Sequence, residues 1–333
     1  MSAPAPAETR SLLAVRDLTI DLPSKQGSVR IVDGVDLSVD SGQVLGIAGE
    51  SGSGKTMTAL ALLGLLPPGA ATGGEAAFQG KDLLRLNPRQ WRATRGDEIG
   101  VVFQDPMTAL HPMLSIERQL TEHMRRHLDL SRHDARDKAV ELLRQVQLPD
   151  PVGSLRSYPH QFSGGMRQRI AIAVALACDP QLLIADEPTT ALDVTVQAGV
   201  LRLLKDLCER IGLAVIVVTH DLGVMSTVAD ELSVFYAGRI VESGSTHELL
   251  RAPRHPYTRG LLDSLPHPER PNEPLVPIEG APATPANRPS GCALHPRCAW
   301  AQPSCSEEIP ALVTIAPGRR NACPVDPFAG GDR

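Results

Sequence analysis

Aromatic residues are scarce in this chain of 333 residues, where Phe, Tyr and Trp together make up 3%. That scarcity argues against a surface that stacks bases or sugars. No apolar run reaches the ~18–20 residues that a transmembrane helix requires, and the longest one, 59–66, stops at Pro67-Pro68. Residues 1–10 lack the apolar segment of a secretory signal. The net charge of −5 gives no indication of nucleic-acid binding. We therefore expect a cytosolic protein that meets a membrane only through partners and does not bind nucleic acid.

Cysteine is also sparse, and its six copies are unevenly placed. Cys178 and Cys208 lie in apolar helical stretches, where buried core residues are expected. The remaining four fall in the last segment: Cys292, Cys298, Cys305 and Cys323. In a cytosolic chain such a group favours metal binding over disulfides. Their spacings, with five, six and seventeen intervening residues, differ from the close pairs of common zinc sites.

The hydrophobic pattern predicts an α/β fold. Alternating residues over 12–22 and 29–39 predict an antiparallel hairpin. Continuous apolar runs predict strands buried on both faces, and helical periodicity separates them, as in a sheet flanked by helices; the runs are 44–48, 99–103, 182–185 and 214–218. Helices are expected over 56–66 and 165–177, and Ser115 and Ser131 are candidate N-caps of others.

The same pass indicates the domain organisation. The stretch 107–178 is almost entirely helical, which predicts a helical subdomain inserted between two halves of the sheet. Prolines become frequent after about residue 251, as in a linker or a small appended module. We therefore predict a main domain over 1–250 and a C-terminal extension over 251–333.

A glycine-rich segment follows the strand predicted at 44–48: Gly49, Glu50, Ser51, Gly52, Ser53, Gly54, Lys55 and Thr56. It matches the P-loop pattern and lies between a strand and a helix, as that pattern requires. Backbone N–H groups of such a loop and the N-terminus of the next helix bind phosphate oxygens. Lys55 is expected to reach the β- and γ-phosphates, and the Thr56 hydroxyl to ligate Mg²⁺. Thr58, on the same helix, completes the predicted nucleotide-binding set.

Polar residues end the other predicted strands. Asp186 and Glu187 follow the strand at 182–185, at the edge where open α/β sheets bind ligands. Asp186 is expected to hold Mg²⁺ directly or through water, and Glu187 to orient or deprotonate the attacking water. His220 is a candidate contact of the γ-phosphate, and Gln104 a candidate contact of Mg²⁺ or the water. The predicted catalytic set is thus Lys55, Gln104, Glu187 and His220.

A P-loop alone leaves kinases, GTPases, helicases and transport ATPases open, and residues 162–169 decide among them. They read Phe-Ser-Gly-Gly-Met-Arg-Gln-Arg. The Ser163 hydroxyl with the N–H groups of Gly164 and Gly165 would form a second anion site at a helix N-terminus. A simple N-cap explains Ser163 but not two glycines, which destabilise a helix. The segment resembles the signature motif of ABC ATPases, with Phe162 in place of the commoner Leu.

The resemblance covers roughly residues 11–250. It implies a RecA-like P-loop core with an antiparallel β subdomain and a helical subdomain. In that family the signature closes over the ATP held by an opposite cassette, so two cassettes enclose two ATP molecules. Gln104 takes the Q-loop position, Ala191-Leu192-Asp193 the D-loop position and His220 the switch-histidine position. The resemblance adds Asp193 to the nucleotide site.

Further sequence segments resemble those of the dipeptide, oligopeptide and nickel importer ATPases. The segments are Val102-Phe103-Gln104-Asp105-Pro106, residues 185–197 and His255-Pro256-Tyr257-Thr258. Met166-Arg167 resembles the first of two paired subunits. The resemblance implies an unlike partner ATPase, two transmembrane permeases and an extracytoplasmic binding protein, with this chain peripheral at the cytoplasmic face of the cell membrane. We expect import of dipeptides or oligopeptides, with nickel or another small solute as the open alternative.

Two other classes fit less well. Soluble ABC ATPases of DNA repair or translation usually carry two cassettes or a long insertion, whereas about a hundred residues separate the P-loop from the signature here. A cassette that does not hydrolyse ATP is disfavoured by the intact Lys55, Asp186, Glu187 and His220.

The resemblance also bears on the tail and on adenine. The four tail cysteines resemble those of the peptide-importer extension, where a [4Fe–4S] cluster is implied. Four thiolates suit Zn²⁺ equally, and free thiols are the third reading. ABC cassettes usually stack adenine on an aromatic residue upstream of the P-loop, but none occurs between Leu12 and Leu45. Leu22 or Arg30 would occupy that place, and no adenine residue is assigned.

Overall fold

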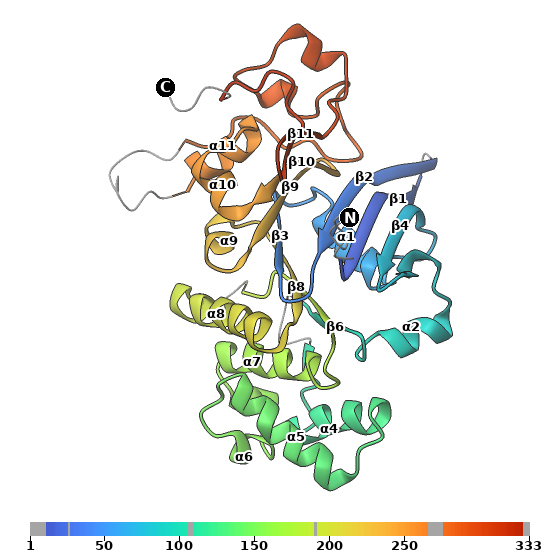
Figure 1. Cartoon of the computed structure of the whole chain (residues 1–333), viewed down its shortest axis with the longest axis vertical. Coiled ribbons are helices and arrows are strands. Elements are labelled where there is room, and N and C mark those ends of the chain that lie inside the picture. The colour runs from blue at the N-terminus through green and yellow to red at the C-terminus, as the bar shows by residue number, and fades with distance from the viewer. Residues whose placement is uncertain (1–10, 26, 105–108, 190–191, 266–275, 329–333) are drawn as a thin grey trace, which may run out of the picture.

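The computed structural model describes residues 11–25, 27–104, 109–189, 192–265 and 276–328. An eight-stranded sheet of order β11-β12-β10-β9-β3-β8-β7-β6 runs through the molecule (Figure 1). Its five parallel strands are β3 (Val44–Ala48), β6 (Ile99–Val102), β7 (Leu182–Asp186), β8 (Ala214–Thr219) and β9 (Glu231–Tyr236). Antiparallel strands extend one edge: β10 (Arg239–Ser245), β12 (Arg319–Asn321) and β11 (Val313–Ala316). The predicted α/β class is confirmed.

A second, four-stranded antiparallel sheet has the order β2-β1-β4-β5. Its strands are β1 (Leu13–Ser24), β2 (Gly27–Val39), β4 (Ala71–Phe78) and β5 (Lys81–Asp82). β1 and β2 pair from Leu13 with Val39 to Ser24 with Gly27, which confirms the predicted hairpin.

Alternation along the parallel strands divides the interior into two cores. Leu182 and Ile184 of β7 face the side covered by the four-stranded sheet and α1 (Lys55–Leu62). Leu183 and Ala185 face the opposite side, where most of the helices pack. Because every second side chain points to each face, a strand covered on both faces must be apolar throughout. That requirement is why the runs predicted as strands are continuous.

The helix after the P-loop is shorter than predicted. α1 ends at Leu62, whereas the periodicity predicted a helix to Leu66. Gly64 has φ 60°, and a Cβ on it would lie 2.3 Å from the Trp91 ring. The chain therefore leaves the helix where a close tertiary contact requires a left-handed glycine.

Helices occupy most of the region predicted to be helical, although residues 107 and 108 lie outside the described ranges. Its elements are α4 (Ile116–His127), α5 (Arg132–Gln145), α6 (Pro151–Ser154), η2 (Pro159–Gln161) and α7 (Gly164–Ala175). Ser115 and Ser131 are N-caps, since their hydroxyls accept the N–H groups of Arg118 and Asp134. Figure 1 places these helices at one end of the molecule, beyond α8.

The other helices complete the layers. They are α2 (Pro88–Thr94), α8 (Val194–Ile211), α9 (Leu222–Val228), α10 (Thr246–Arg251) and α11 (Pro256–Asp263), with short turns η1 (Leu83–Arg85), η3 (His295–Arg297) and η4 (Pro303–Ser306). The boundary predicted at residue 250 falls within α10, and the division into domains stays a prediction. In the described ranges, none of the helices has the length and apolar character needed to cross a bilayer.

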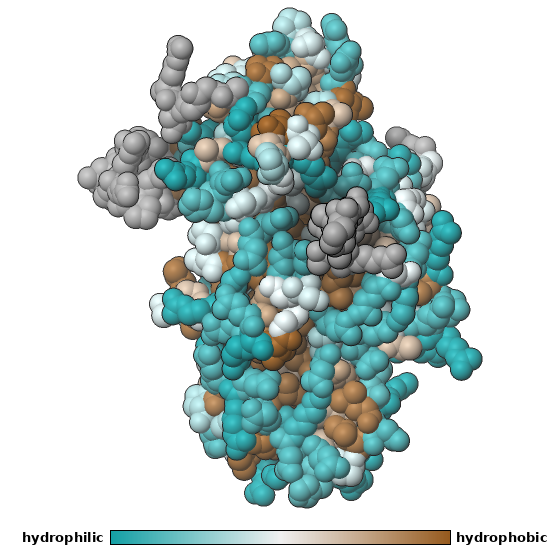
Figure 2. Space-filling model, in the orientation of Figure 1, coloured by the Kyte–Doolittle hydropathy of each residue, from teal (hydrophilic) through white to brown (hydrophobic). Residues whose placement is uncertain are grey.

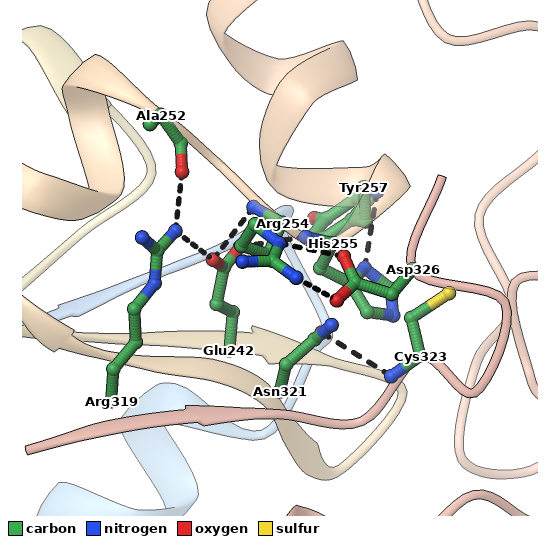
Figure 3. A network of polar contacts seen from close by, with 9 residues as sticks. All are labelled: Glu242, Ala252, Arg254, His255, Tyr257, Arg319, Asn321, Cys323 and Asp326. Carbon is green, nitrogen blue, oxygen red and sulfur yellow. Dashed lines mark hydrogen bonds and ion pairs between the residues drawn. The ribbon is translucent and has the colours of Figure 1, made fainter. Parts of the chain in front are cut away.

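The last described segment joins the main sheet. β12 pairs with β10 through Asn321 opposite Glu242 and Arg320 opposite Ser243. Figure 3 shows Glu242 within a network of polar contacts from α11, its preceding loop and β12. The segment 276–328 is thus packed onto the edge of the main sheet through backbone pairing and buried polar contacts.

Candidate functional site

The glycine-rich segment forms a tight loop between β3 and α1. A Cβ on Gly49 would lie 2.2 Å from the Phe235 carbonyl oxygen, so only glycine fits there. Gly54 begins α1 in a left-handed conformation, with φ 103°. Ser51 and Gly52 are exposed at the outer turn, whereas Ser53 is buried. Such a loop at a helix N-terminus presents N–H groups to an anion.

Lys55 lies across this loop. Its ammonium nitrogen donates to the carbonyl oxygens of Gly49 at 2.7 Å and Glu50 at 2.9 Å. The side chain is buried, and burial lowers its pKa, while the charges of Glu187, Asp186 and Glu50 act in the opposite direction. The loop, a buried ammonium and nearby carboxylates therefore share one site.

Thr56 and Asp186 approach each other from α1 and from the end of β7. The Thr56 hydroxyl is 3.4 Å from Asp186 Oδ1. Burial raises the pKa of Asp186, which the Thr56 hydroxyl and Lys55 oppose. Thr58 is placed differently: it is fully buried, and its hydroxyl donates to the Gly54 carbonyl oxygen within the helix.

Gln104, Glu187 and His220 form a contiguous group. Gln104 Nε2 donates to Glu187 Oε2 at 2.8 Å, and His220 Nδ1 lies 3.1 Å from Glu187 Oε1. Glu187 has φ 47°, and its N–H donates to the Val218 carbonyl oxygen at 2.8 Å. A non-glycine residue in this region is strained, and such strain concentrates at functional sites. Parallel pairing of β6, β7, β8 and β3 brings these strand ends together.

The signature segment has a different set of neighbours. Ser163 is the N-cap of α7, and its hydroxyl accepts the Met166 N–H. A Cβ on Gly165 would lie 2.3 Å from Val196 Cγ1, whereas one on Gly164 would be 3.4 Å from Leu192. Asp193 caps α8 by accepting the Val196 N–H at 3.0 Å. The predicted signature and Asp193 are therefore adjacent, while the P-loop contacts β9 and α11.

Two contacts of the P-loop were not predicted from the sequence. The Tyr257 hydroxyl on α11 accepts the Glu50 N–H at 2.8 Å. Arg297 pairs with the Glu50 carboxylate through both terminal nitrogens, at 2.9 and 3.2 Å. Tyr257 lies in the segment His255-Pro256-Tyr257-Thr258 that resembles the importer ATPases, and Arg297 lies beside Cys298, but neither signal points to the P-loop.

The four tail cysteines lie near one another without forming a ligand set. The Cys292 N–H donates to the Cys305 carbonyl oxygen at 2.7 Å. Burial raises the pKa of Cys292, and the charges of Cys305, Cys323 and Cys298 add to that effect. Throughout the described residues, no group of three or more His, Cys, Asp and Glu side chains is placed to hold a metal ion. As placed, the thiols therefore do not fit the predicted [4Fe–4S] cluster or Zn²⁺.

Other predicted residues fall as follows. Cys178 and Cys208 are buried, and burial raises the pKa of each thiol to about 11, as expected of core residues. Leu22 packs against the core beneath the β1–β2 hairpin, and Arg30 pairs with Asp21 at 3.0 Å. Four residues of the resemblance motifs lie outside the described ranges: Asp105, Pro106, Thr190 and Ala191.

Comparisons with known proteins agree with this geometry. Residues 32–190 match the ABC transporter family, and residues 241–305 match the C-terminal region of oligopeptide/dipeptide transporters. The chain is similar to the solved dimeric structure of the ABC transporter cassette MJ0796, with 28% identity and a TM-score of 0.61, over 70% of this chain and 98% of that one.

Curated relatives match almost the whole chain. The probable peptide ABC transporter ATP-binding protein y4tR of Sinorhizobium fredii is 48% identical over 94% of both chains. The oligopeptide transport ATP-binding protein OppD of Bacillus subtilis is 47% identical over 92% of this chain and 86% of its own. The dipeptide transport ATP-binding protein DppD of Escherichia coli is 43% identical over 94% of this chain and 96% of its own. The chain therefore belongs to the ABC transporter ATPases that carry the oligopeptide/dipeptide transporter C-terminal region.

Proposed function

We propose that this ATPase energises the import of dipeptides or oligopeptides across the cell membrane. The observation that carries the hydrolytic role is the contact of Glu187 with both Gln104 and His220 beside the P-loop. The match of residues 241–305 and the names of the relatives support the cargo class. The same match argues against a soluble ABC ATPase outside transport.

Phosphoryl transfer depends mainly on positioning and charge neutralisation. In this proposal Lys55 and the N–H groups of residues 49–56 hold the β- and γ-phosphates of ATP. Thr56 and Asp186 offer a hydroxyl and a carboxylate oxygen 3.4 Å apart, which are ligands of the kind Mg²⁺ prefers. The amide oxygen of Gln104 is a further candidate ligand of Mg²⁺. Bound Mg²⁺ would supply charge neutralisation at the phosphates. Thr58 contributes only as part of α1, because its hydroxyl is engaged within the helix.

Glu187 orients or deprotonates the attacking water. Gln104 and His220 each contact one of its carboxylate oxygens, so the accepting group is fixed by two neighbours from different strands. His220 is itself half exposed, which leaves it able to contact the γ-phosphate. A general base needs this combination of reach and orientation.

The signature acts on a second cassette. Ser163, Gly164 and Gly165 begin α7 and pack beside Asp193, and these residues meet the ATP of the partner subunit. The different neighbours of the signature and the P-loop support a site shared between two cassettes. We propose an unlike ATPase subunit as that partner.

Two permeases and an extracytoplasmic peptide-binding protein complete the transporter, with this chain peripheral at the cytoplasmic face. Figure 2 shows brown, apolar patches over the helical end of the molecule. Met113, Val152 and Tyr158 of this end are 76%, 50% and 41% exposed. Exposed apolar patches are typical of protein contact surfaces, and those that Figure 2 shows at this end support permease docking there.

The cysteine group adds a separate proposal. A [4Fe–4S] cluster, with Zn²⁺ as the alternative, would be held by Cys292, Cys298, Cys305 and Cys323. Because these thiols do not converge in the structure, binding requires them to move closer together. Anaerobic purification followed by iron, sulfide and zinc analysis tests it. Absence of all three elements at molar ratio would leave the free-thiol reading.

The function is tested by ATP turnover of the complete transporter in liposomes. The binding protein is added empty or loaded with short peptides, and phosphate release is measured. Stimulation by the peptide-loaded protein supports both importer and cargo. Robust turnover without peptide stimulation would retain the ATPase and redirect the cargo assignment to nickel or another small solute, because other subunits select the cargo.

A further inference from the structure

Glu50, the second residue of the P-loop, is held from the C-terminal part of the chain through both its carboxylate and its backbone N–H. Its carboxylate receives both terminal nitrogens of Arg297, and its N–H donates to the Tyr257 hydroxyl. The Arg297 side chain is only 5% exposed. The two partners are 247 and 207 residues away in sequence, so the contact exists only through the fold.

A carboxylate here opposes the function of the loop. Phosphate binding is favoured by N–H groups and positive charge, and Glu50 brings a negative charge beside Lys55, whose ammonium it influences. A bidentate guanidinium forms a strong, charge-assisted pair with a carboxylate, and the pair carries no net charge. Arg297 therefore cancels the charge that would otherwise repel phosphate.

The position of Arg297 is fixed by further contacts. It donates to the carbonyl oxygens of Glu279 at 2.9 Å and Ile278 at 3.2 Å, and to the Tyr236 hydroxyl at 3.2 Å. Tyr236 is the last residue of β9 and follows Phe235, whose carbonyl oxygen packs against Gly49. An arginine whose donors are all directed in this way holds Glu50 in one orientation.

Tyr257 is fixed by the network in Figure 3. Glu242 is fully buried and accepts the N–H groups of Arg254 and His255 at 2.8 and 3.0 Å, and Arg319 donates to it at 3.0 Å. His255 Nδ1 accepts the Tyr257 N–H at 3.1 Å and caps α11. The buried start of α11 thus sets where the Tyr257 hydroxyl meets the P-loop.

We propose that Arg297 and Tyr257 are positioning residues of the ATP site, through which the C-terminal region sets the affinity of the P-loop for ATP. Arg297 neutralises Glu50, and Tyr257 fixes the first peptide group of the loop. The proposal rests on ATP binding at the P-loop and is independent of the cargo and of what the cysteines bind.

The test is a double-mutant cycle on the full-length chain. ATP affinity is measured with a fluorescent ATP analogue, and KM and kcat by phosphate release, for Arg297→Gln, Glu50→Gln and the double variant. Arg297→Gln is expected to weaken ATP binding about tenfold, mainly through KM, because it leaves the Glu50 charge unpaired. Glu50→Gln is expected to tighten binding, and the double variant to return within about threefold of the wild type.

Controls separate positioning from folding. Arg320→Gln removes an arginine of β12 that contacts Ser243 and the Asp36 carbonyl oxygen, away from the P-loop, and is expected to leave ATP affinity unchanged. Tyr257→Phe is expected to raise KM with kcat held. Wild-type affinity in Arg297→Gln overturns the proposal, and so does a double variant as weak as Arg297→Gln with the same melting temperature. If Arg297→Gln fails to fold, weaker ATP binding by Glu50→Gln than by the wild type overturns the proposal.

Discussion

Protonation of His255 is expected to destabilise this chain as the pH falls below neutrality. His255 is 1% exposed, and burial lowers its pKa to about 3. Its Nδ1 accepts the Tyr257 N–H, so the folded state holds a neutral ring with its proton on Nε2. A proton on Nδ1 would remove that acceptor and place a charge in the core.

The sign follows from comparing the two states. In the unfolded chain His255 binds a proton below pH ~6.5, whereas the folded chain binds it only near the depressed pKa of about 3. Its contribution to stability is therefore complete above pH ~6.5 and is lost progressively as the pH falls from there toward 3. Roughly 1.5 pH units separate pH 5 from the unfolded-state pKa of ~6.5, so the free energy of unfolding falls by about 2 kcal/mol between pH 7 and pH 5.

Other charged groups lie close to His255, so a matched variant is needed. Glu242, Arg254, Arg319 and Asp326 lie in the same network (Figure 3). His255→Asn keeps a side-chain acceptor at the N-cap and cannot titrate. Subtracting its pH dependence from that of the wild type removes the contribution of the neighbours to first order.

The assay is urea unfolding of the purified full-length chain at pH 7 and pH 5, followed by circular dichroism. The wild type is expected to lose about 2 kcal/mol more than His255→Asn between the two values. Equal losses in both proteins would refute the reasoning, because they would show that His255 does not remain neutral in the fold.

Three further outcomes follow from the structure. Glu187→Gln is expected to bind ATP and trap a closed pair of cassettes while turnover falls on the order of 100-fold or more, since an amide cannot accept the water proton. Phosphate release measures the turnover and size-exclusion chromatography with ATP detects the closed pair; a normal rate would show that the base is another residue. Gly165→Ala is expected to lower the free energy of unfolding by about 1–3 kcal/mol, because the added Cβ would collide with Val196. Gly164→Ala, with room for a Cβ, is the control, and equal effects of the two substitutions in chemical denaturation would contradict the argument. Cys178 and Cys208, whose pKa values burial raises to about 11, are expected to resist alkylation at pH 8 in the folded chain; rapid labelling of either in peptide mapping would mean that it is accessible.

Most of the central sheet could be predicted because its signals are local. The runs at β3, β7 and β8 are apolar throughout since both faces are covered, and each is followed by a polar motif. The end of α1 could not be placed, because it depends on Trp91 lying against Gly64. Periodicity over 56–66 carries no information about a side chain that arrives from another element.

The candidate site divides in the same way. Asp186, Glu187, His220 and Gln104 were predictable, since each lies within two residues of a strand end that parallel pairing places at one edge. Lys55 was predictable from the P-loop pattern, which places it at the start of the next helix. Their mutual contacts, with Glu187 between Gln104 and His220, depend on the order of the strands in the sheet. The metal centre was predicted from the number of cysteines, and that number does not determine whether four thiols separated by loops lie close together.

The amino-acid sequence by itself determined the P-loop, the signature, the order of the motifs and the hairpin. These features are set by hydrogen bonds and side-chain patterns within a few residues of one another. Only the tertiary structure decided that Tyr257 and Arg297 reach Glu50, that Glu242 anchors the segment leading into α11, and that β12 joins the sheet edge. The P-loop contacts and the joining of β12 link segments more than 200 and about 80 residues apart. Glu242 and His255 are 13 residues apart, and their contact also depends on burial and packing that no local pattern encodes.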